Sequence, residues 1–327
     1  SYTKLSSLNI SGTNIYSLNC SNNLLTTLVV AGASNLNYLY CDYNNLTTLD
    51  LSSLTSLYSF SSTYNYSLSC ISVADVDVAL GAGWSIDSWS TFKLLSSPCI
   101  YTAIPDANFE QALIDLGHDT IIDGKVLTNS VTSITSLDVS NKSVSNLYGI
   151  KSFTALQHLN CSSNSLSAID LVGLTNLKTI DCSSNSIAEF FMTNTTNLTS
   201  LNCSYNFYLS SLNLSGLTNL NTLVCGYNQL TSLNFTGLTH LATLDCSNNS
   251  LPTLSYTGLT TLTSLDCSGT ERTSLSLSGL TNLVSLKFSD NLLTTINLSG
   301  LSNLKTLDCS NNKLSTVSLS GLDRKSV

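Results

Sequence analysis

Charged side chains are scarce in this sequence of 327 residues. Asp, Glu, Lys and Arg together make up 10% of it, well under the roughly one quarter that is usual in soluble proteins. The net charge of −8 argues against nucleic acid or an anionic membrane as a partner, because both bind basic surfaces. Long apolar runs are missing too: no stretch of about 18 apolar residues exists, so we expect no membrane insertion.

Histidine is also rare, and its three copies lie far apart at His118, His158 and His240. This spacing favours neither a catalytic triad nor a zinc site. The glycines are spread along the chain instead of clustering into a phosphate-binding loop. We therefore expect a protein that is not an enzyme and that uses no cofactor and no metal.

A repeat of 21 or 22 residues is what the sequence has in abundance. Residues 307–314 (LDCSNNKL) show its most regular part, and their first leucine is called the reference residue below. A fixed period over this much chain predicts a solenoid in which each copy forms one turn. The reference position recurs at Leu18, Leu39, Phe60, Leu137, Leu159, Ile180, Leu201, Leu223, Leu244, Leu265, Leu286 and Leu307.

Each copy has two stretches in which apolar residues alternate. The first, Leu-x-x-Leu-x-Cys, predicts a short strand, and successive copies stack these strands into a parallel sheet on the concave face. The second, Thr-Ser-Leu-x-Leu, predicts a short extended segment on the convex side rather than a helix. Leucines further along each copy fill the interior between the two sides.

An asparagine follows the reference residue by five positions in most copies. It falls where the chain turns inward, and a buried amide there can bond backbone groups of neighbouring turns that strand ends leave unpaired. These positions are Asn23, Asn44, Asn65, Asn164, Asn185, Asn206, Asn228, Asn249, Asn291 and Asn312.

The period breaks between Phe60 and Leu137, and the break begins with a predicted cap. Residues 72–80 have the pattern of a short capped helix. Trp84 and Trp89 follow it, which is typical of a solenoid end where bulky aromatics cover the exposed core.

A second helix is predicted after Asp106, which is a suitable N-cap. Phe109, Leu113 and Leu116 share one face of this helix and Gly117 stops it, as in an N-terminal cap of a new array. The sequence thus predicts a first array over 1–68, its C-terminal cap over 69–100, an N-terminal cap over 101–130 and a second array over 131–327.

The cap phrases at residues 70–73 and 99–113 resemble the inter-array junction of Bacteroidetes surface leucine-rich-repeat proteins. The Leu-x-Cys-Ser-x-Asn-x-Leu repeat is similar to theirs and more distantly to internalins, and the resemblance covers essentially the whole chain. It implies a mostly β leucine-rich-repeat solenoid of the α/β type with a parallel concave sheet and small helical caps. It also implies a secreted or cell-surface protein, often exported by the type IX route. The C-terminal sorting domain of that route is absent from this sequence, so the export route stays open.

Eleven cysteines fall into two groups. Nine stand two positions after the reference residue, in a single file that can neither surround a metal ion nor pair easily, so we expect free buried thiols. The other two, Cys70 and Cys99, flank the C-terminal cap. We expect a disulfide between them because the cap has little core and its compartment is expected to be oxidising; two unpaired cysteines are the alternative. The nine are Cys20, Cys41, Cys161, Cys182, Cys203, Cys225, Cys246, Cys267 and Cys309.

Tyrosines gather on or beside the predicted concave strands of the first array. Tyrosine offers a large amphipathic contact area at low entropic cost, and interfaces favour it. The candidate binding residues are Tyr16, Tyr38, Tyr40, Tyr43, Tyr58 and Tyr64, with Tyr205 and Tyr227 in the second array.

An acidic ladder follows the reference residue by one position in the second array and includes Asp181, Asp245, Asp266 and Asp308. Neighbouring carboxylates repel one another, and Lys287 can partly offset this. The ladder predicts either an acidic stripe for a basic partner or a cation, or a solvated ridge that discourages aggregation.

One copy departs from the pattern, with Thr270 in place of the asparagine and Arg272 in place of an inward leucine. A buried arginine needs a partner, so we expect a local bulge there, either as a tolerated defect or as a contact point. Separately, residues 119–121 match the short acceptor pattern of Bacteroidetes O-glycosylation, which makes Thr120 a candidate site.

Two functions fit these features. The first is a non-enzymatic, extracellular or cell-surface adhesion scaffold that recognises protein or glycan through the concave face. The alternative is a stalk or filament subunit that self-associates end to end. The sequence begins and ends in the middle of a repeat, which fits either a piece of a longer protein or a fibre.

We predict that mass spectrometry of an unreduced digest links Cys70 to Cys99. In the chain-entropy model, closing this loop of 29 residues stabilises the cap by about 3–4 kcal/mol. Two separately alkylated cysteines would refute the pairing.

Overall fold

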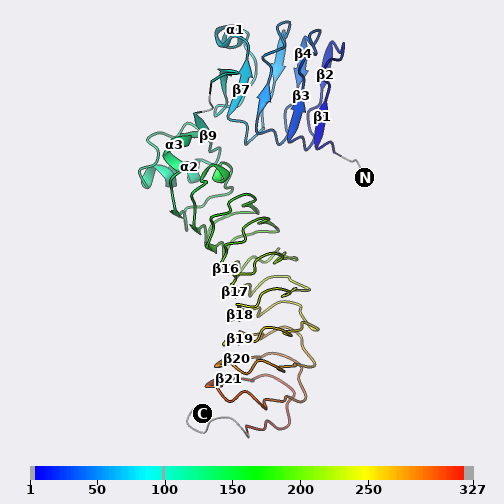
Figure 1. Ribbon diagram of the computed structural model, residues 1–327, viewed down its shortest axis with the longest axis vertical. Coiled ribbons are helices and arrows are strands. Elements are labelled where there is room, and N and C mark those ends of the chain that lie inside the picture. Colours follow the sequence, from blue (N-terminus) through cyan, green and yellow to red (C-terminus); the bar gives the residue numbers. More distant parts are fainter. Residues whose placement is uncertain (1–3, 98–99, 320–327) are drawn as a thin grey trace. The chain divides into compact units, whose positions relative to one another are not determined.

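The computed structural model describes residues 4–97 and 100–319, which form two compact units (Figure 1). Unit 1 comprises residues 1–133 and 147–153, and unit 2 comprises residues 134–146 and 154–327. Together they contain about 14 turns of parallel-strand solenoid with few helices, which confirms the predicted fold class.

Unit 1 has short strands on two sides of its turns. One parallel sheet has the order β2-β4-β6; the pair β1-β3 and the sheet β5-β7-β8 complete the parallel strands, and β9 pairs with β10 antiparallel. The strands are β1 (Ser7–Asn9), β2 (Ser17–Asn19), β3 (Thr27–Val29), β4 (Tyr38–Tyr40), β5 (Leu49–Asp50), β6 (Ser59–Ser61), β7 (Cys70–Val73), β8 (Thr91–Leu94), β9 (Tyr101–Ala103) and β10 (Lys125–Leu127). The helices are α1 (Val76–Gly81), α2 (Ala107–Asp115), α3 (Thr128–Val131) and the 3-10 helix η1 (Ile150–Ser152).

Unit 2 is dominated by one nine-stranded parallel sheet, called the main sheet below. A second side carries the parallel pair β13 (Ala168–Asp170) and β15 (Glu189–Phe191), so at these two turns it is extended as the alternation predicts. The main sheet follows the chain in the order β11 (Ser136–Asp138), β12 (His158–Asn160), β14 (Thr179–Asp181), β16 (Ser200–Asn202), β17 (Thr222–Val224), β18 (Thr243–Asp245), β19 (Ser264–Asp266), β20 (Ser285–Lys287) and β21 (Thr306–Asp308).

The reference residues set the register of the main sheet. Leu137 pairs with Leu159, and the same one-to-one pairing continues strand by strand to Leu307. Because side chains alternate along a strand, this register sends every reference residue to the same side. Leucines further along the same turn, such as Leu251 and Leu259, are buried as well. In unit 1 the buried residues from Ile10 to Ala79 form one hydrophobic core.

The predicted asparagine ladder is confirmed. Asn249 is buried, and its Nδ2 donates to the carbonyls of Cys225 (2.9 Å) and Cys246 (3.2 Å). Its Oδ1 accepts from the backbone N–H of Leu230 at 2.9 Å. Each amide therefore satisfies backbone groups of its own turn and of the preceding one, where no sheet partner is available. The same set of bonds recurs at Asn44, Asn65, Asn164, Asn185, Asn206, Asn228, Asn291 and Asn312.

The first predicted cap differs from the sequence expectation at its start. Helix α1 begins after Asp75, whose side chain accepts from the amides of Asp77 and Val78, because the residues before it extend strand β7. Trp84 packs edge-on against Phe60 at a centroid distance of 5.5 Å, so an aromatic covers the end of the core as predicted.

Helix α2 also differs in one respect. Asp106 is its N-cap and Phe109 and Leu113 are buried, as expected. Leu116 is exposed, however, because the helix ends at Asp115 and Leu116 is already the C-cap residue.

We predict that Asn249→Ala lowers the free energy of unfolding of unit 2 by about 3 kcal/mol or more, because three buried backbone groups lose their partner. Denaturant unfolding measures the loss. Asn303→Ala is the matched control: this exposed amide makes one bond, to the carbonyl of Thr281, and its loss should cost under about 1 kcal/mol. Equal losses in the two variants would contradict the role assigned to the ladder.

Candidate functional site

A row of three tyrosines runs along the start of the β2-β4-β6 strands in unit 1. The ring of Tyr38 contacts Tyr16 and Tyr58 edge-on, at centroid distances of 5.5 and 5.9 Å. Tyr16 is 60% exposed and Tyr58 is 73% exposed. The structure thus joins three of the sequence-predicted residues into one surface, called the tyrosine row below.

Tyr38 and Tyr40 are both half-buried, although alternation alone would turn them fully to solvent. The neighbouring rings cover part of Tyr38. The phenol oxygen of Tyr40 lies 3.2 Å from Oγ of Ser59 on the next strand. The hydroxyl of Tyr40 therefore reaches the next strand, and Tyr40 is not one of the rings in contact in the row.

The other predicted tyrosines lie beyond the strands, in the turn that the asparagine ladder closes. Tyr43 and Tyr64 stack with centroids 4.2 Å apart and planes 10° from parallel. In unit 2, Tyr205 and Tyr227 stack in the same way, at 4.3 Å and 8°. All four adopt a left-handed backbone conformation, with φ between 53° and 59°.

Sequence reasoning missed the aromatic residues next to these pairs. Tyr66 packs at a right angle to Tyr64, and Phe207 does the same to Tyr205. Phe207 is 57% exposed and Tyr208 beside it is exposed as well. The signal was present in the sequence as an aromatic residue directly after the ladder asparagine, a position that most copies fill with a polar side chain or with Leu.

The acidic ladder lies in register along the main sheet. Asp245 pairs with Asp266, which in turn pairs with Lys287. The Nζ of Lys287 lies 3.5 Å from Oδ2 of Asp266, so the expected partial compensation takes the form of an ion pair. This pair is partly exposed, and such pairs contribute little to stability.

Each ladder carboxylate also closes a local turn. Oδ1 of Asp308 accepts from both the amide and the hydroxyl of Ser310, and these bonds lower the pKa of Asp308. Asp245 and Asp181 bond Ser247 and Ser183 in the same way. One oxygen of each carboxylate is therefore committed to the fold. The second oxygen of Asp181 also accepts from Nδ2 of Asn202 at 3.0 Å.

Arg272 is buried at 2% exposure, which contradicts a role as a contact point. Its Nη2 donates to the carbonyl of Leu254, and its Cζ lies 5.0 Å from the ring centroid of Tyr256, which supplies a cation–π partner. The backbone does change locally, since Glu271 adds a second left-handed residue directly after Thr270.

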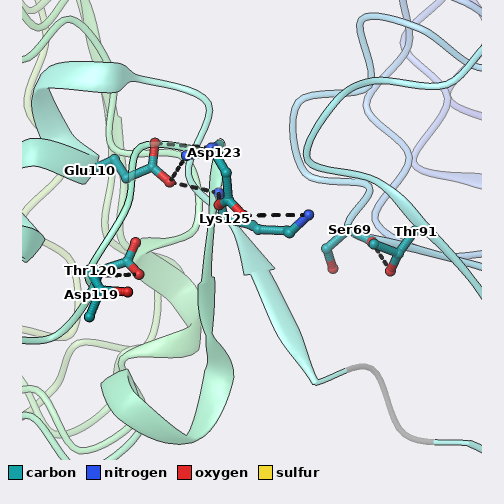
Figure 2. Close-up of polar contacts among 8 residues, drawn as sticks. Ser69, Thr91, Glu110, Asp119, Thr120, Asp123 and Lys125 are labelled. Atoms are coloured by element: carbon teal, nitrogen blue, oxygen red, sulfur yellow. Dashed lines mark hydrogen bonds and ion pairs between the residues drawn. The ribbon is translucent and has the colours of Figure 1, made fainter.

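The second cap holds a buried carboxylate that the sequence did not single out (Figure 2). Glu110 accepts from the backbone amides of Asp123, Gly124 and Lys125 at 2.9–3.0 Å. Burial raises the pKa of Glu110, and the three donors act against that shift. Glu110 therefore holds the loop of residues 123–125 in place. Thr120 is exposed nearby, with its amide bonded to Oδ1 of Asp119, and its glycosylation stays a prediction.

The cysteine file consists of free thiols, eight of them buried and Cys309 half-buried. Cys70 is not among the free thiols, and Cys99 lies outside the described residues, so their pairing stays a prediction. The Sγ of Cys41 contacts the carbonyl of Ser61 on the next strand at 3.4 Å. Burial raises the pKa of the eight buried thiols, to about 11 for Cys20 and Cys267 and about 12 for Cys203. A buried thiol that resists ionisation is a poor nucleophile.

Within the described residues, no group of three or more His, Cys, Asp or Glu side chains is placed to hold a metal ion. His158 contacts Oγ1 of Thr179, and His240 contacts the carbonyl of Thr218, so these two histidines serve separate turns. Over the same part of the chain, no helix is both long and apolar enough to cross a membrane.

The family model for leucine-rich repeats in two copies matches residues 154–194, within unit 2. The fold is a leucine-rich-repeat solenoid. No curated relative matches the chain.

Solved leucine-rich-repeat structures resemble this one. A leucine-rich-repeat protein of Leptospira interrogans is 19% identical, with a TM-score of 0.55 over 98% of this chain and 89% of that one. Internalin C2 of Listeria monocytogenes is 23% identical, with a TM-score of 0.55 over 64% of this chain and 94% of that one. Both similarities show the fold.

The functional domain of InlJ from Listeria monocytogenes, which includes a cysteine ladder, is 26% identical with a TM-score of 0.46. The match covers 67% of this chain and 58% of that one, so this chain spans less than two thirds of the InlJ structure.

We predict that the native protein loses stability as pH rises above about 9. The folded state raises the thiol pKa above its ordinary value of 9.0, so the unfolded chain ionises first. The stabilising contribution is therefore complete below pH 9 and is lost towards pH 11. Melting temperatures measured across this range check the sign.

A variant with Cys161→Val and Cys182→Val is the control, because Val139 already occupies the equivalent position of the file. It should lose part of the alkaline sensitivity. Thiol titration should also find few reactive groups in the native protein and about nine more after unfolding. Fast labelling of the folded chain would refute the assignment.

Proposed function

We propose that this protein is a non-enzymatic binding scaffold that recognises a protein or glycan partner through the strand face of its solenoid. The tyrosine row is the observation that carries the proposal. Tyr16, Tyr38 and Tyr58 form an exposed aromatic surface held on rigid strands, and such surfaces serve as interaction sites more often than as plain exterior.

The position of the tyrosines on strands also favours binding energetically. The tyrosines stand on neighbouring strands in fixed register, so a partner meets a surface whose backbone is already ordered. Little conformational entropy is then lost on binding, and the aromatic rings contribute most of the contact area. The likeness to leucine-rich-repeat structures fits a scaffold that presents a surface rather than a catalytic centre.

Surface or secreted placement belongs to the same proposal. It draws on the resemblance of the cap junction at residues 99–113 to Bacteroidetes surface proteins, together with the similarity of the repeat to internalins. Fractionation of the producing cells, with and without a block of type IX export, tests both the location and the route.

A stalk or filament remains the second candidate function, favoured by the regular stacking of identical turns along the main sheet. Size-exclusion chromatography with light scattering separates the two. A monomer disfavours the filament, whereas concentration-dependent growth of the particle would favour it. A glycan array combined with a pull-down of surface proteins identifies the partner of a monomer.

We predict that Tyr38→Ala combined with Tyr40→Ala weakens the binding of a partner found in that screen by about 2 kcal/mol or more, which is the size of effect seen at interface hot spots. Asp245→Asn with Asp266→Asn should cost less and mainly change the salt dependence, because these carboxylates belong to the main sheet of unit 2 and not to the tyrosine row, and they are partly bonded to the fold. Affinity measured at two salt concentrations decides between them. The reverse ranking would move the site to the acidic ladder of unit 2.

A further inference from the structure

The same three-ring arrangement occurs once in each unit. In unit 1 it consists of the Tyr43–Tyr64 stack with Tyr66 perpendicular to Tyr64, at 6.4 Å and 81°. In unit 2 it consists of the Tyr205–Tyr227 stack with Phe207 perpendicular to Tyr205, at 6.3 Å and 86°. Each set is called an aromatic corner below, and every ring in it is exposed. Tyr66 also stacks on Trp89 at 5.9 Å and on Tyr148 at 5.2 Å, so the candidate ligand faces in unit 1 are those of Tyr43 and Tyr64.

The position of the stacked tyrosines is costly for a bulky side chain. The residue before the ladder asparagine has positive φ throughout, and other turns fill it with small or polar residues such as Asn22, Asn248 and Asp290. Asparagine tolerates this conformation, whereas a large side chain there is strained by about 1–3 kcal/mol. The fold therefore does not require tyrosine at these turns. The backbone strain that the stacked pairs introduce points to a role in binding.

Carboxylates stand beside both corners. In unit 1, Asp87 accepts from the amide of Tyr64 itself, and Asp42 accepts from the amide and hydroxyl of Thr63. The hydrogen bond that the neutral Tyr43 hydroxyl donates to Tyr64 raises the pKa of Tyr43, and the charge of Asp42 acts in the same direction. Among the residues that the structure describes, no basic side chain forms an ion pair with either carboxylate.

In unit 2 the carboxylate belongs to Asp245. Gly226 precedes Tyr227 where most other turns have Ser, and a Cβ on it would lie 3.0 Å from Oδ1 of Asp245 and 2.8 Å from Oγ of Ser247. The missing side chain lets Asp245 lie against this turn. Desolvation raises the pKa of Tyr205, and Tyr227 and the Asp245 charge raise it further.

We propose that each aromatic corner binds a cationic side chain of a basic peptide segment, stacked on an exposed tyrosine face and facing the neighbouring carboxylate. This rests on the proposed binding function and names a chemical class of partner for it. A neutral sugar would also stack on tyrosine, but an electron-rich ring beside a carboxylate without a basic partner favours a cation. The net charge of −8 attracts such a segment from a distance.

The test uses the full chain and the peptide acetyl-Gly-Arg-Gly-Arg-Gly-amide in titration calorimetry at low ionic strength. The citrulline counterpart keeps the shape and removes the charge. We expect two sites per chain and an affinity for the citrulline peptide that is at least about tenfold weaker. Cellohexaose serves as the sugar probe and should bind more weakly than the arginine peptide.

Tyr→Asn changes locate the sites without disturbing the fold, because Asn occupies this position in other turns. Tyr43→Asn combined with Tyr64→Asn should remove the unit 1 site, and Tyr205→Asn combined with Tyr227→Asn should remove the unit 2 site. The fourfold variant should bind at neither site, and none of these variants should have a lower melting temperature. Phe191→Ser is the control, since it removes an exposed ring that belongs neither to the corners nor to the tyrosine row and should leave two sites.

Asp245→Asn tests the charge at the unit 2 corner. Asn202 makes the same turn with Ser204 that Asp245 makes with Ser247, so the geometry survives. With the unit 1 site removed, this change should weaken arginine-peptide binding about threefold or more.

Equal binding of the citrulline peptide, stronger binding of cellohexaose, full binding by the fourfold variant or no binding at all would each overturn the proposal. If a partner is still captured in the glycan and surface-protein screen, the proposed function survives that failure. Conversely, two arginine-peptide sites without any captured partner would support the corners and count against the scaffold function.

Discussion

The solenoid depends on one buried amide per turn. Where each strand ends, the backbone groups of two neighbouring turns would be left without partners inside the protein, and an unpaired buried group costs about 1–3 kcal/mol. The asparagine of that turn, such as Asn249, donates to carbonyls of its own turn and of the previous one and accepts from one amide, so it links the two turns. Stacking of identical turns is possible because the same solution recurs along the chain.

The exceptions show how strict this constraint is. In the copy that lacks the asparagine, Thr270 donates to the carbonyl of Cys267, and its amide uses Oδ1 of Asn291 from the next turn. The backbone then needs a second left-handed residue at Glu271, and the same compensation occurs at Ser143, directly after Lys142 takes the asparagine position. Arg272 stays inside because a carbonyl and the ring of Tyr256 receive its guanidinium.

The other polar side chains that repeat along the solenoid are also used largely to satisfy the backbone. A ladder carboxylate such as Asp245 uses one oxygen to close its own turn, and the thiols of the cysteine file are buried against the backbone of the next strand. Reactive chemistry is therefore disfavoured along the interior. The exposed side chains that the fold itself does not use are aromatic, and they lie at the starts of strands and in the left-handed turns.

The sequence alone determined the repeat, the strand register, the asparagine bonds and the free thiols, because a side chain repeated at a fixed interval meets the same neighbour in every turn. Burial of Glu110 and the start of α1 at Val76 depended on non-repeating contacts inside the caps, which periodicity does not specify. Tertiary structure also decided how the tyrosines group. Tyr38 joins Tyr16 and Tyr58, while Tyr40 bonds Ser59 and Tyr43 stacks on Tyr64, since ring packing depends on backbone conformation and not on spacing alone.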